Sequence, residues 1–265
     1  MTGEPFGAFA PSRLQNAIIN GVRATPVLRR GTFRPWVAKW LTALRPGPID
    51  VERNGVKFRL TLDNNPIEWG VALMPGYEGP EIQFLADGLS PGSTLIDIGA
   101  NVGLYGLSLA PKVGPTGKVI AIEADPVAQL RVAENARLNA WPQVKVVLAA
   151  AGDRDGEARF AAKTNFAHSK VTADGEVVVP MRTLAGILAE HDITRIDALK
   201  IDVEGYEDQV LLPFFESAPK AHWPKRVVIE DLFIDKSADN SVKRMKSLGY
   251  REAGRNRINA FLLLE

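Results

Sequence analysis

Acidic side chains and glycines follow three short apolar runs, and these are the positions from which the chain could do chemistry. Asp97 precedes the turn 99–103, Glu123 ends the next apolar run, and Asp202 with Glu204 follows a later one. Short apolar runs bounded by such residues are typical of buried parallel strands, and open α/β sheets bind ligands at the carboxyl ends of their strands. We therefore expect these groups to meet at one edge of a sheet.

The turn after Asp97 could bind either of two cofactors, a dinucleotide such as NAD(P) or S-adenosylmethionine. A dinucleotide fingerprint counted from Gly99 would need glycines where the chain has Asn101 and Leu104. S-adenosylmethionine carries a sulfonium cation, which a carboxylate at the strand end favours. Glu123 suits the ribose hydroxyls of either cofactor. Asp97 with the turn therefore predicts S-adenosylmethionine, and an NAD(P)-dependent oxidoreductase is the alternative.

We expect the glycines to let the cofactor approach the backbone, because glycine lacks a Cβ atom. The loop before the first strand should flank the methionine end, and small residues after the third strand should leave room for adenine. Ordinary loop and helix-capping carboxylates are the competing interpretation. The predicted cofactor-binding residues are Tyr77, Glu78, Asp97, Gly99, Ala100, Asn101, Gly103, Glu123, Ala124, Ala151 and Asp202.

Asp202 and Glu204 predict a second chemical site beside the turn. Either carboxylate could accept a proton from an acceptor hydroxyl, next to Lys200. A Mg²⁺ ion is a second interpretation, because carboxylate oxygens are its preferred ligands. Helix capping, with Glu230 paired to Lys200, is the third. The predicted metal ligands are Asp202, Glu230 and Asp231.

Strand and helix patterns alternate from residue 94 onward and predict an α/β, Rossmann-like fold. We expect a seven-stranded sheet with helices on both faces and a terminal antiparallel hairpin. The helix over 126–139 should bury an apolar face of Val127, Leu130, Ala133 and Leu138. A hairpin inserted at about 157–182 carries His168, a further catalytic candidate, although a lone histidine in a polar loop is more often solvated.

The first 48 residues predict a basic helical cap before the main domain, 49–265. Two interpretations stay open: a cap packed on the core through Ile18, Ile19, Trp36 and Trp40, or a surface for an anionic acceptor or a membrane. Asn54-Gly55 predicts a hairpin over 49–62 as an added edge of the core. Residues 6–49 contain no acidic side chain and seven basic ones: Arg13, Arg23, Arg29, Arg30, Arg34, Lys39 and Arg45.

Composition narrows the class of protein. The 265 residues are 46% hydrophobic and 24% charged, which is ordinary for a soluble domain. A formal net charge of +1 and a strand end reading Asp-Val-Glu-Gly argue against nucleic acid as a partner. The chain has no cysteine, so it has no disulfide or thiolate site. No apolar run is long enough to span a membrane, and we expect a cytoplasmic location.

Several segments together resemble the FkbM family of S-adenosylmethionine-dependent O-methyltransferases, over about residues 74–264. The resemblance implies methyl transfer to a hydroxyl group of a sugar, glycolipid or polyketide, and it does not name the acceptor. A non-catalytic protein that binds S-adenosylmethionine is another alternative. The segments are Asp97-Ile-Gly-Ala-Asn-Val-Gly103, Glu123, 134–139, Gly152-Asp153 with Gly156, Thr183-Leu184 and, most specifically, Leu199-Lys-Ile-Asp-Val-Glu-Gly-Tyr-Glu207.

Overall fold

The computed structural model describes residues 3–29, 31–63, 65–161, 170–171, 175–232 and 239–265. Its main sheet consists of β3 (Thr94–Ile98), β4 (Lys118–Glu123), β5 (Val144–Leu148), β10 (Ala198–Ile201), β11 (Arg226–Glu230), β12 (Tyr250–Arg255) and β13 (Asn259–Leu264). The strand order is β12-β13-β11-β10-β3-β4-β5. Only β13 pairs antiparallel, with β11 and with β12. The predicted seven-stranded sheet and its terminal hairpin are confirmed.

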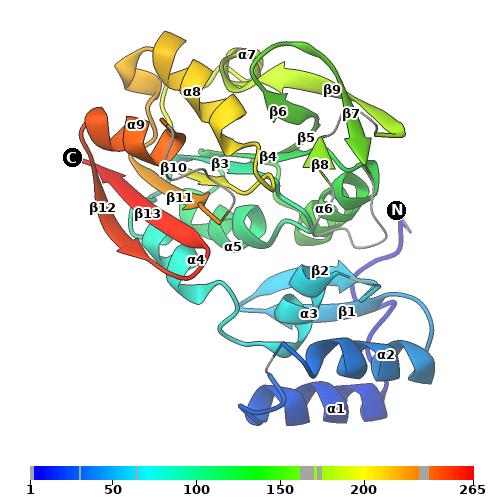
Figure 1. Cartoon of the computed structure of the whole chain (residues 1–265). Helices are drawn as coiled ribbons and strands as arrows, with labels where there is room; N and C mark the ends of the chain where they lie inside the picture. The colour runs from blue at the N-terminus through cyan, green and yellow to red at the C-terminus, as the bar shows by residue number, and fades with distance from the viewer. Residues whose placement is uncertain (1–2, 30, 64, 162–169, 172–174, 233–238) are drawn as a thin grey trace.

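Helices cover both faces of this sheet (Figure 1). Side chains alternate between faces along a strand, so Leu95 and Val119 pack in one apolar cluster, and Ile96 and Ile120 pack in another. The first face carries α4 (Gly79–Ala86), α5 (Leu104–Val113) and α6 (Pro126–Asn139). The second carries α7 (Leu184–Glu190), α8 (Glu207–Ser217) and α9 (Ser241–Ser247), and a 3₁₀ turn, Lys220–His222, precedes β11. The predicted α/β class is confirmed.

A second sheet interrupts the alternation. It consists of β6 (Ala150–Gly152), β7 (Gly156–Ala161), β8 (Lys170–Val171) and β9 (Val177–Thr183), in the order β6-β9-β7-β8. β7 pairs antiparallel with β9, which confirms a hairpin inserted at about 157–182. His168 lies outside the described residues.

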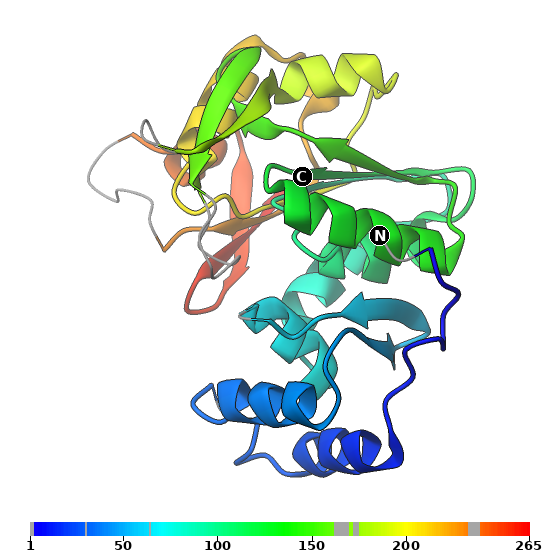
Figure 2. The ribbon, with the colours of Figure 1, turned by 90° about the vertical axis from the view of Figure 1, so that its right-hand side faces the viewer.

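The N-terminal elements lie together below α5 and α6 in Figures 1 and 2 and are called the N-terminal lobe below. They are α1 (Arg13–Ala24), α2 (Arg34–Leu44), β1 (Ile49–Arg53), β2 (Val56–Leu60) and α3 (Pro66–Leu73). Ser12 caps the N-terminus of α1. The hairpin is confirmed, but its predicted place is wrong, because β1 and β2 form their own two-stranded sheet. The helix α3 was not predicted, and the domain boundary at residues 48 and 49 stays a prediction.

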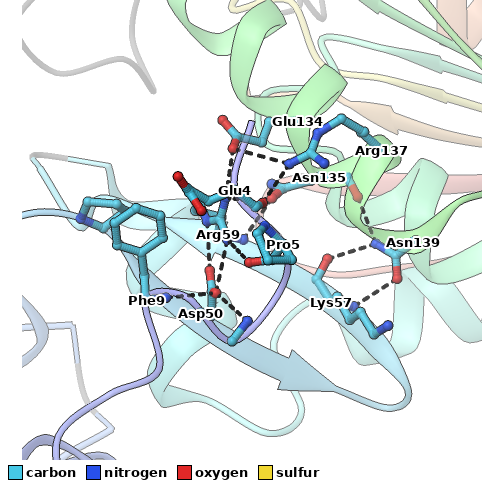
Figure 3. Close-up of polar contacts among 12 residues, drawn as sticks. Glu4, Pro5, Phe9, Asp50, Lys57, Arg59, Glu134, Asn135, Arg137 and Asn139 are labelled. Carbon is cyan, nitrogen blue, oxygen red and sulfur yellow. Dashed lines mark hydrogen bonds and ion pairs between the residues drawn. The ribbon is translucent and has the colours of Figure 1, made fainter. Parts of the chain in front are cut away.

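A buried arginine joins the N-terminal lobe to α6 (Figure 3). Arg59 on β2 forms ion pairs of 2.8 Å with Asp50 on β1 and with Glu134 on α6. It also donates to two carbonyl oxygens of the N-terminal segment and lies 4.5 Å from the ring centroid of Phe9. The residues of this Arg59 cluster are Glu4, Pro5, Phe9, Asp50, Arg59 and Glu134.

Two predicted packing faces are only partly correct. Ile18 and Ile19 pack on the core, but Trp36 and Trp40 are 69% and 66% exposed and do not. On α6, Leu138 is buried, but Val127 and Leu130 are 46% and 45% exposed. The side of α6 that faces β2 is held by polar groups instead, since the amide of Asn135 accepts the backbone N–H of Arg59 at 2.7 Å.

Candidate active site

The turn between β3 and α5 needs its two glycines for contacts within the protein. Gly99 has a φ of +74°, and a Cβ atom there would overlap the backbone carbonyl oxygen of Asp202. Gly103 has a φ of +85°, and its Cβ would lie 2.7 Å from Cγ2 of Val132 on α6. Both positions therefore require glycine before any ligand binds. The predicted reason, close approach of the cofactor, is not the one that these contacts support.

Asp97, at the end of β3, lies beneath the turn and is fully buried. Its Oδ2 atom accepts the backbone N–H of Gly106 on α5 at 2.9 Å. Its Oδ1 atom has no hydrogen-bond donor among the described residues, and the nearest cation, Nζ of Lys200, is 3.9 Å away. Burial raises the pKa of the Asp97 carboxyl group above its usual value. Asp97 thus ties β3, α5 and β10 together.

Glu123, at the end of β4, holds the turn from the other side. Its carboxylate accepts the backbone N–H groups of Asn101, at 2.7 Å, and of Asp125, at 2.8 Å. Burial raises the pKa of Glu123 to about 7, although these two hydrogen bonds lower it. The adjacent Ala124 is partly buried beside Ala150, Val179 and Met181, and Ala151 is buried in the apolar cluster on the second face of the main sheet.

A cavity of about 300 Å³ opens on the β10 side of the turn. Its size is near the lower end for small-molecule sites. The predicted site residues on its wall are Tyr77, Glu78, Gly99, Ala100, Asn101, Lys200, Asp202, Glu204 and Glu230. The unpredicted ones are Pro66, Ile67, Leu104, Tyr105, Leu232, Ile258 and Asn259. The predicted residues that do not form this wall are Asp97, Gly103, Glu123, Ala124, Ala151 and Asp231.

Lys200 is the buried cation between the turn and the cavity. Its ammonium group donates to the carbonyl oxygen of Gly99 at 2.9 Å, lies 3.6 Å from the Asp202 carboxylate and lies 5.4 Å from the ring centroid of Tyr105. Burial lowers the pKa of Lys200, but Asp202, Asp97 and other nearby carboxylates outweigh that effect and raise the pKa above its usual value. Lys200 is therefore protonated and cannot serve as the base.

Two carboxyl groups on the cavity wall hold protons more tightly than usual. Burial raises the pKa of Glu78, whose carboxylate accepts the Tyr105 hydroxyl at 2.6 Å. Burial, the charges of Asp202 and Glu204, and a hydrogen bond to Asp202 raise the pKa of Glu230 to about 9. Glu230 is thus protonated near neutral pH and can donate its proton to Asp202.

A family model described as the methyltransferase FkbM domain matches residues 97–252, more than half of the chain. The chain belongs to the FkbM methyltransferase family. This finding confirms the resemblance seen in the sequence. The FkbM match begins at Asp97 and includes the turn, Glu123 and the carboxyl groups of β10 and β11. It excludes part of the cavity wall, namely Pro66, Ile67, Tyr77, Glu78, Ile258 and Asn259.

The FkbM chain is also similar to solved methyltransferase structures, at low identity. Trm5b from Pyrococcus abyssi is 15% identical with a TM-score of 0.45, over 81% of this chain and 54% of that one. Precorrin-6y C5,15-methyltransferase from Geobacter metallireducens GS-15 is 11% identical with a TM-score of 0.44, over 72% and 87%. TYW2 from M. jannaschii, in complex with AdoMet, is 15% identical with a TM-score of 0.41, over 82% and 87%. The chain spans about half the length of Trm5b, and no curated protein sequence matches it.

The predicted metal ligands are not brought together. The Asp231 carboxylate accepts hydrogen bonds from Arg255, and Asp231 is absent from the cavity wall on which Asp202 and Glu230 lie. Within the described part of the chain, no group of three or more histidine, cysteine or acidic side chains could hold a metal ion. The alternative ion pair of Glu230 with Lys200 is also not observed, because Lys200 pairs with Asp97 and Asp202.

Tyr105 is the main cavity residue that the sequence interpretation missed. It lies two residues after Gly103, in the first turn of α5, where a side chain can reach back over the turn. That position could have identified Tyr105 as a residue of the cavity wall from the sequence. Pro66 and Ile67 gave no such signal, because nothing in their local sequence shows that α3 folds back to the end of β3.

Proposed function

We propose that the FkbM domain transfers a methyl group from S-adenosylmethionine to a hydroxyl oxygen of a sugar, glycolipid or polyketide-type acceptor. One observation carries the proposal: the family match covers both the glycine turn and the carboxyl groups of β10 and β11, and one cavity is lined by both. When bound, S-adenosylmethionine supplies an electrophilic methyl group on a sulfonium centre.

The charge of the cavity supports a cationic cofactor. Four acidic side chains line it, namely Glu78, Asp202, Glu204 and the protonated Glu230, and Lys200 is the one basic side chain among the described residues of the wall. Such an excess of carboxyl groups favours a positively charged ligand. The residues expected to hold the cofactor are the turn 99–101 on the cavity wall and, behind that wall, Glu123, whose two oxygens each accept one backbone N–H group and keep a lone pair for ribose hydroxyls.

We assign acceptance of the hydroxyl proton to Asp202. Its side chain is 35% exposed toward the cavity mouth, while Lys200 at 3.6 Å and the protonated Glu230 fix its position. The acceptor O–H bond breaks as its oxygen forms a bond to the methyl carbon, and the methyl–sulfur bond breaks. Alignment of these atoms supplies part of the rate enhancement. Glu204 is the second candidate base on the same wall.

The wall outside the family match is suited to choosing the acceptor. Pro66, Ile67 and Ile258 are apolar, and Asn259 is polar. This combination can accommodate the apolar face and the hydroxyl groups of a sugar or polyketide ring. These residues lie outside residues 97–252, so the family match does not describe this part of the wall.

A ligand-binding experiment followed by product analysis tests the proposal. S-adenosylmethionine and S-adenosylhomocysteine should raise the melting temperature, and NAD should not, because a ligand that binds only the folded state stabilises it. Methyl transfer from labelled cofactor is then measured on sugar, glycolipid and polyketide panels, with tRNA as the control acceptor. A melting temperature raised by NAD alone, or label found on tRNA only, would refute the proposal.

A further inference from the structure

An apolar stripe runs along the outer side of α2. Successive members are three or four residues apart, which places them on one face of a helix. The opposite side of α2 faces the lobe, where Ala38 and Leu41 are buried. The stripe consists of Phe33, Trp36, Trp40 and Leu44, which are 41%, 69%, 66% and 46% exposed. Large aromatic side chains left on a surface in a contiguous patch mark a site of interaction.

The charge around this stripe is positive and is not balanced locally. Residues 6–49 carry seven basic and no acidic side chains, whereas the other 221 residues carry 25 basic and 31 acidic ones, a net charge of −6. In the part of the chain that the structure describes, Arg13, Arg29 and Lys39 form no ion pair with a carboxylate. The lobe therefore presents an apolar stripe within a basic surface, at one end of the molecule (Figures 1 and 2).

We propose that this face of α2 docks the protein on an anionic membrane surface. Tryptophan and phenylalanine insert at the level of the lipid head groups, and basic side chains beside them attract anionic lipids. A polyanion such as RNA would satisfy the arginines but not the aliphatic members of the patch. Those are Leu44 and, in the connection between α1 and α2, Val27 and Leu28, which are 50% and 36% exposed.

The lobe also connects this surface to the cavity. α3 packs against α1 and α2 and supplies Pro66 and Ile67 to the cavity wall. Docking through α2 would therefore place α3 and its side of the cavity toward the membrane. No residue of α2 lines the cavity, so the inference does not depend on the proposed methyl transfer. Among the described residues, no helix combines the length and apolar character needed to cross a bilayer, and the contact is peripheral.

Vesicle binding tests the inference in the full-length protein. Vesicles of phosphatidylcholine with roughly one third phosphatidylglycerol should co-sediment with the protein, and pure phosphatidylcholine vesicles should bind it much less. Tryptophan emission should shift to shorter wavelength on binding, because Trp36 and Trp40 leave water. Equal binding to neutral and anionic vesicles, or binding to neither, would overturn the proposal.

Matched variants distinguish binding through this face of α2 from nonspecific binding of the protein to vesicles. The double variant Trp36→Ala, Trp40→Ala should bind anionic vesicles about tenfold more weakly or less and should lose the emission shift. Its control, Val127→Ala with Leu130→Ala, removes side chains of 46% and 45% exposure from α6 and should bind like the wild type.

A charge variant tests the electrostatic part. Lys39→Gln should weaken binding by about fivefold, the effect of one basic residue at an anionic surface, while Lys112→Gln on α5 should not. Wild-type vesicle binding by the tryptophan variant would overturn the proposal. It would also be overturned if the stripe proved to be a dimer contact, seen as dissociation of a dimer by the tryptophan variant with no vesicle binding by the wild type.

Discussion

Arg59 and Lys200 are both buried cations among carboxylates, and they differ in how well the charges around them are balanced. Every nitrogen of the Arg59 guanidinium donates a hydrogen bond, to Asp50, to Glu134 or to a backbone carbonyl oxygen (Figure 3). Burial raises the pKa of Asp50, but the hydrogen bonds from Arg59, Gly7 and Phe9 outweigh it and lower that pKa. The Arg59 cluster therefore favours the charged forms of its members.

The cavity around Lys200 instead favours the protonated, uncharged forms of its carboxyl groups. Glu78 and Glu230 have raised pKa values, mainly because they are buried and lie near other acids. Asp97 keeps one oxygen without a donor in the described residues. An imbalance of this kind costs stability and is characteristic of functional sites. The balanced Arg59 cluster therefore stabilises the fold, and the unbalanced cavity agrees with the proposed binding of a cationic ligand.

Changing one carboxylate in each region should have the largest and most different effects. Asp202→Asn should lower kcat by about 10²–10⁴-fold, because a general base contributes that much. Its melting temperature should change little, since the Asp202 side chain is 35% exposed. Single-turnover methyl transfer and a melting curve measure the two effects.

Asp50→Asn is the matched control for Asp202→Asn. Asp50 is buried in the Arg59 cluster, so its variant should lose stability and keep kcat per folded molecule. If Asp202→Asn kept kcat within about threefold of the wild type, general-base catalysis by Asp202 would be ruled out.

Replacing Arg59, the buried cation whose charge is balanced by nearby carboxylates, should have the next largest effect, on the free energy of unfolding. Arg59→Met leaves Asp50 and Glu134 without their buried partner and should lower the free energy of unfolding by about 3–5 kcal/mol. Arg154→Met is the control, because Arg154 pairs with Asp153 on the surface and such pairs contribute about 0–1 kcal/mol. Urea unfolding measures both. Equal losses in the two variants would mean that the Arg59 cluster does not stabilise the contact between the lobe and α6.

Much of the FkbM domain was predictable because its signals are local. Buried strands such as β3 and β10 are short apolar runs, and the acids and glycines that end them mark where a sheet edge carries chemistry. The positions of Lys200, Asp202 and Glu230 on one cavity wall follow from the parallel order of neighbouring strands. Strand order in this fold class is regular enough for sequence reasoning to use.

The remaining features depend on partners that are distant in the sequence. Gly99 is required by the carbonyl oxygen of Asp202, about a hundred positions later in the chain. Whether Trp36 and Trp40 pack on the core or face water depends on how α2 lies on α1 and α3, which helical periodicity alone does not determine. The polar inner side of α6 likewise follows from its contact with β2.

The raised pKa of Glu230 should also make the stability of the protein depend on pH. Its pKa is about 9 in the folded protein and near its ordinary value of 4.5 when unfolded. Between these pH values the folded state binds one more proton than the unfolded state. The contribution of Glu230 to the free energy of unfolding is therefore fully present below about pH 4.5 and is lost as pH rises toward 9. The slope is at most about 1.4 kcal/mol per pH unit. Glu230→Gln exchanges no proton, so its stability relative to the wild type should rise across this range.

Urea unfolding of both proteins between about pH 5 and pH 9 measures this difference. Glu252→Gln is the control with the opposite sign. Its hydrogen bonds from Arg255 and Lys246 lower the pKa of Glu252 to about 2, so its contribution is present above about pH 4.5 and lost in acid. Its stability relative to the wild type should therefore stay constant between pH 5 and pH 9. If the Glu230→Gln and wild-type curves also ran parallel, Glu230 would not be held protonated, and Asp202 would lack the donor that we assign to it.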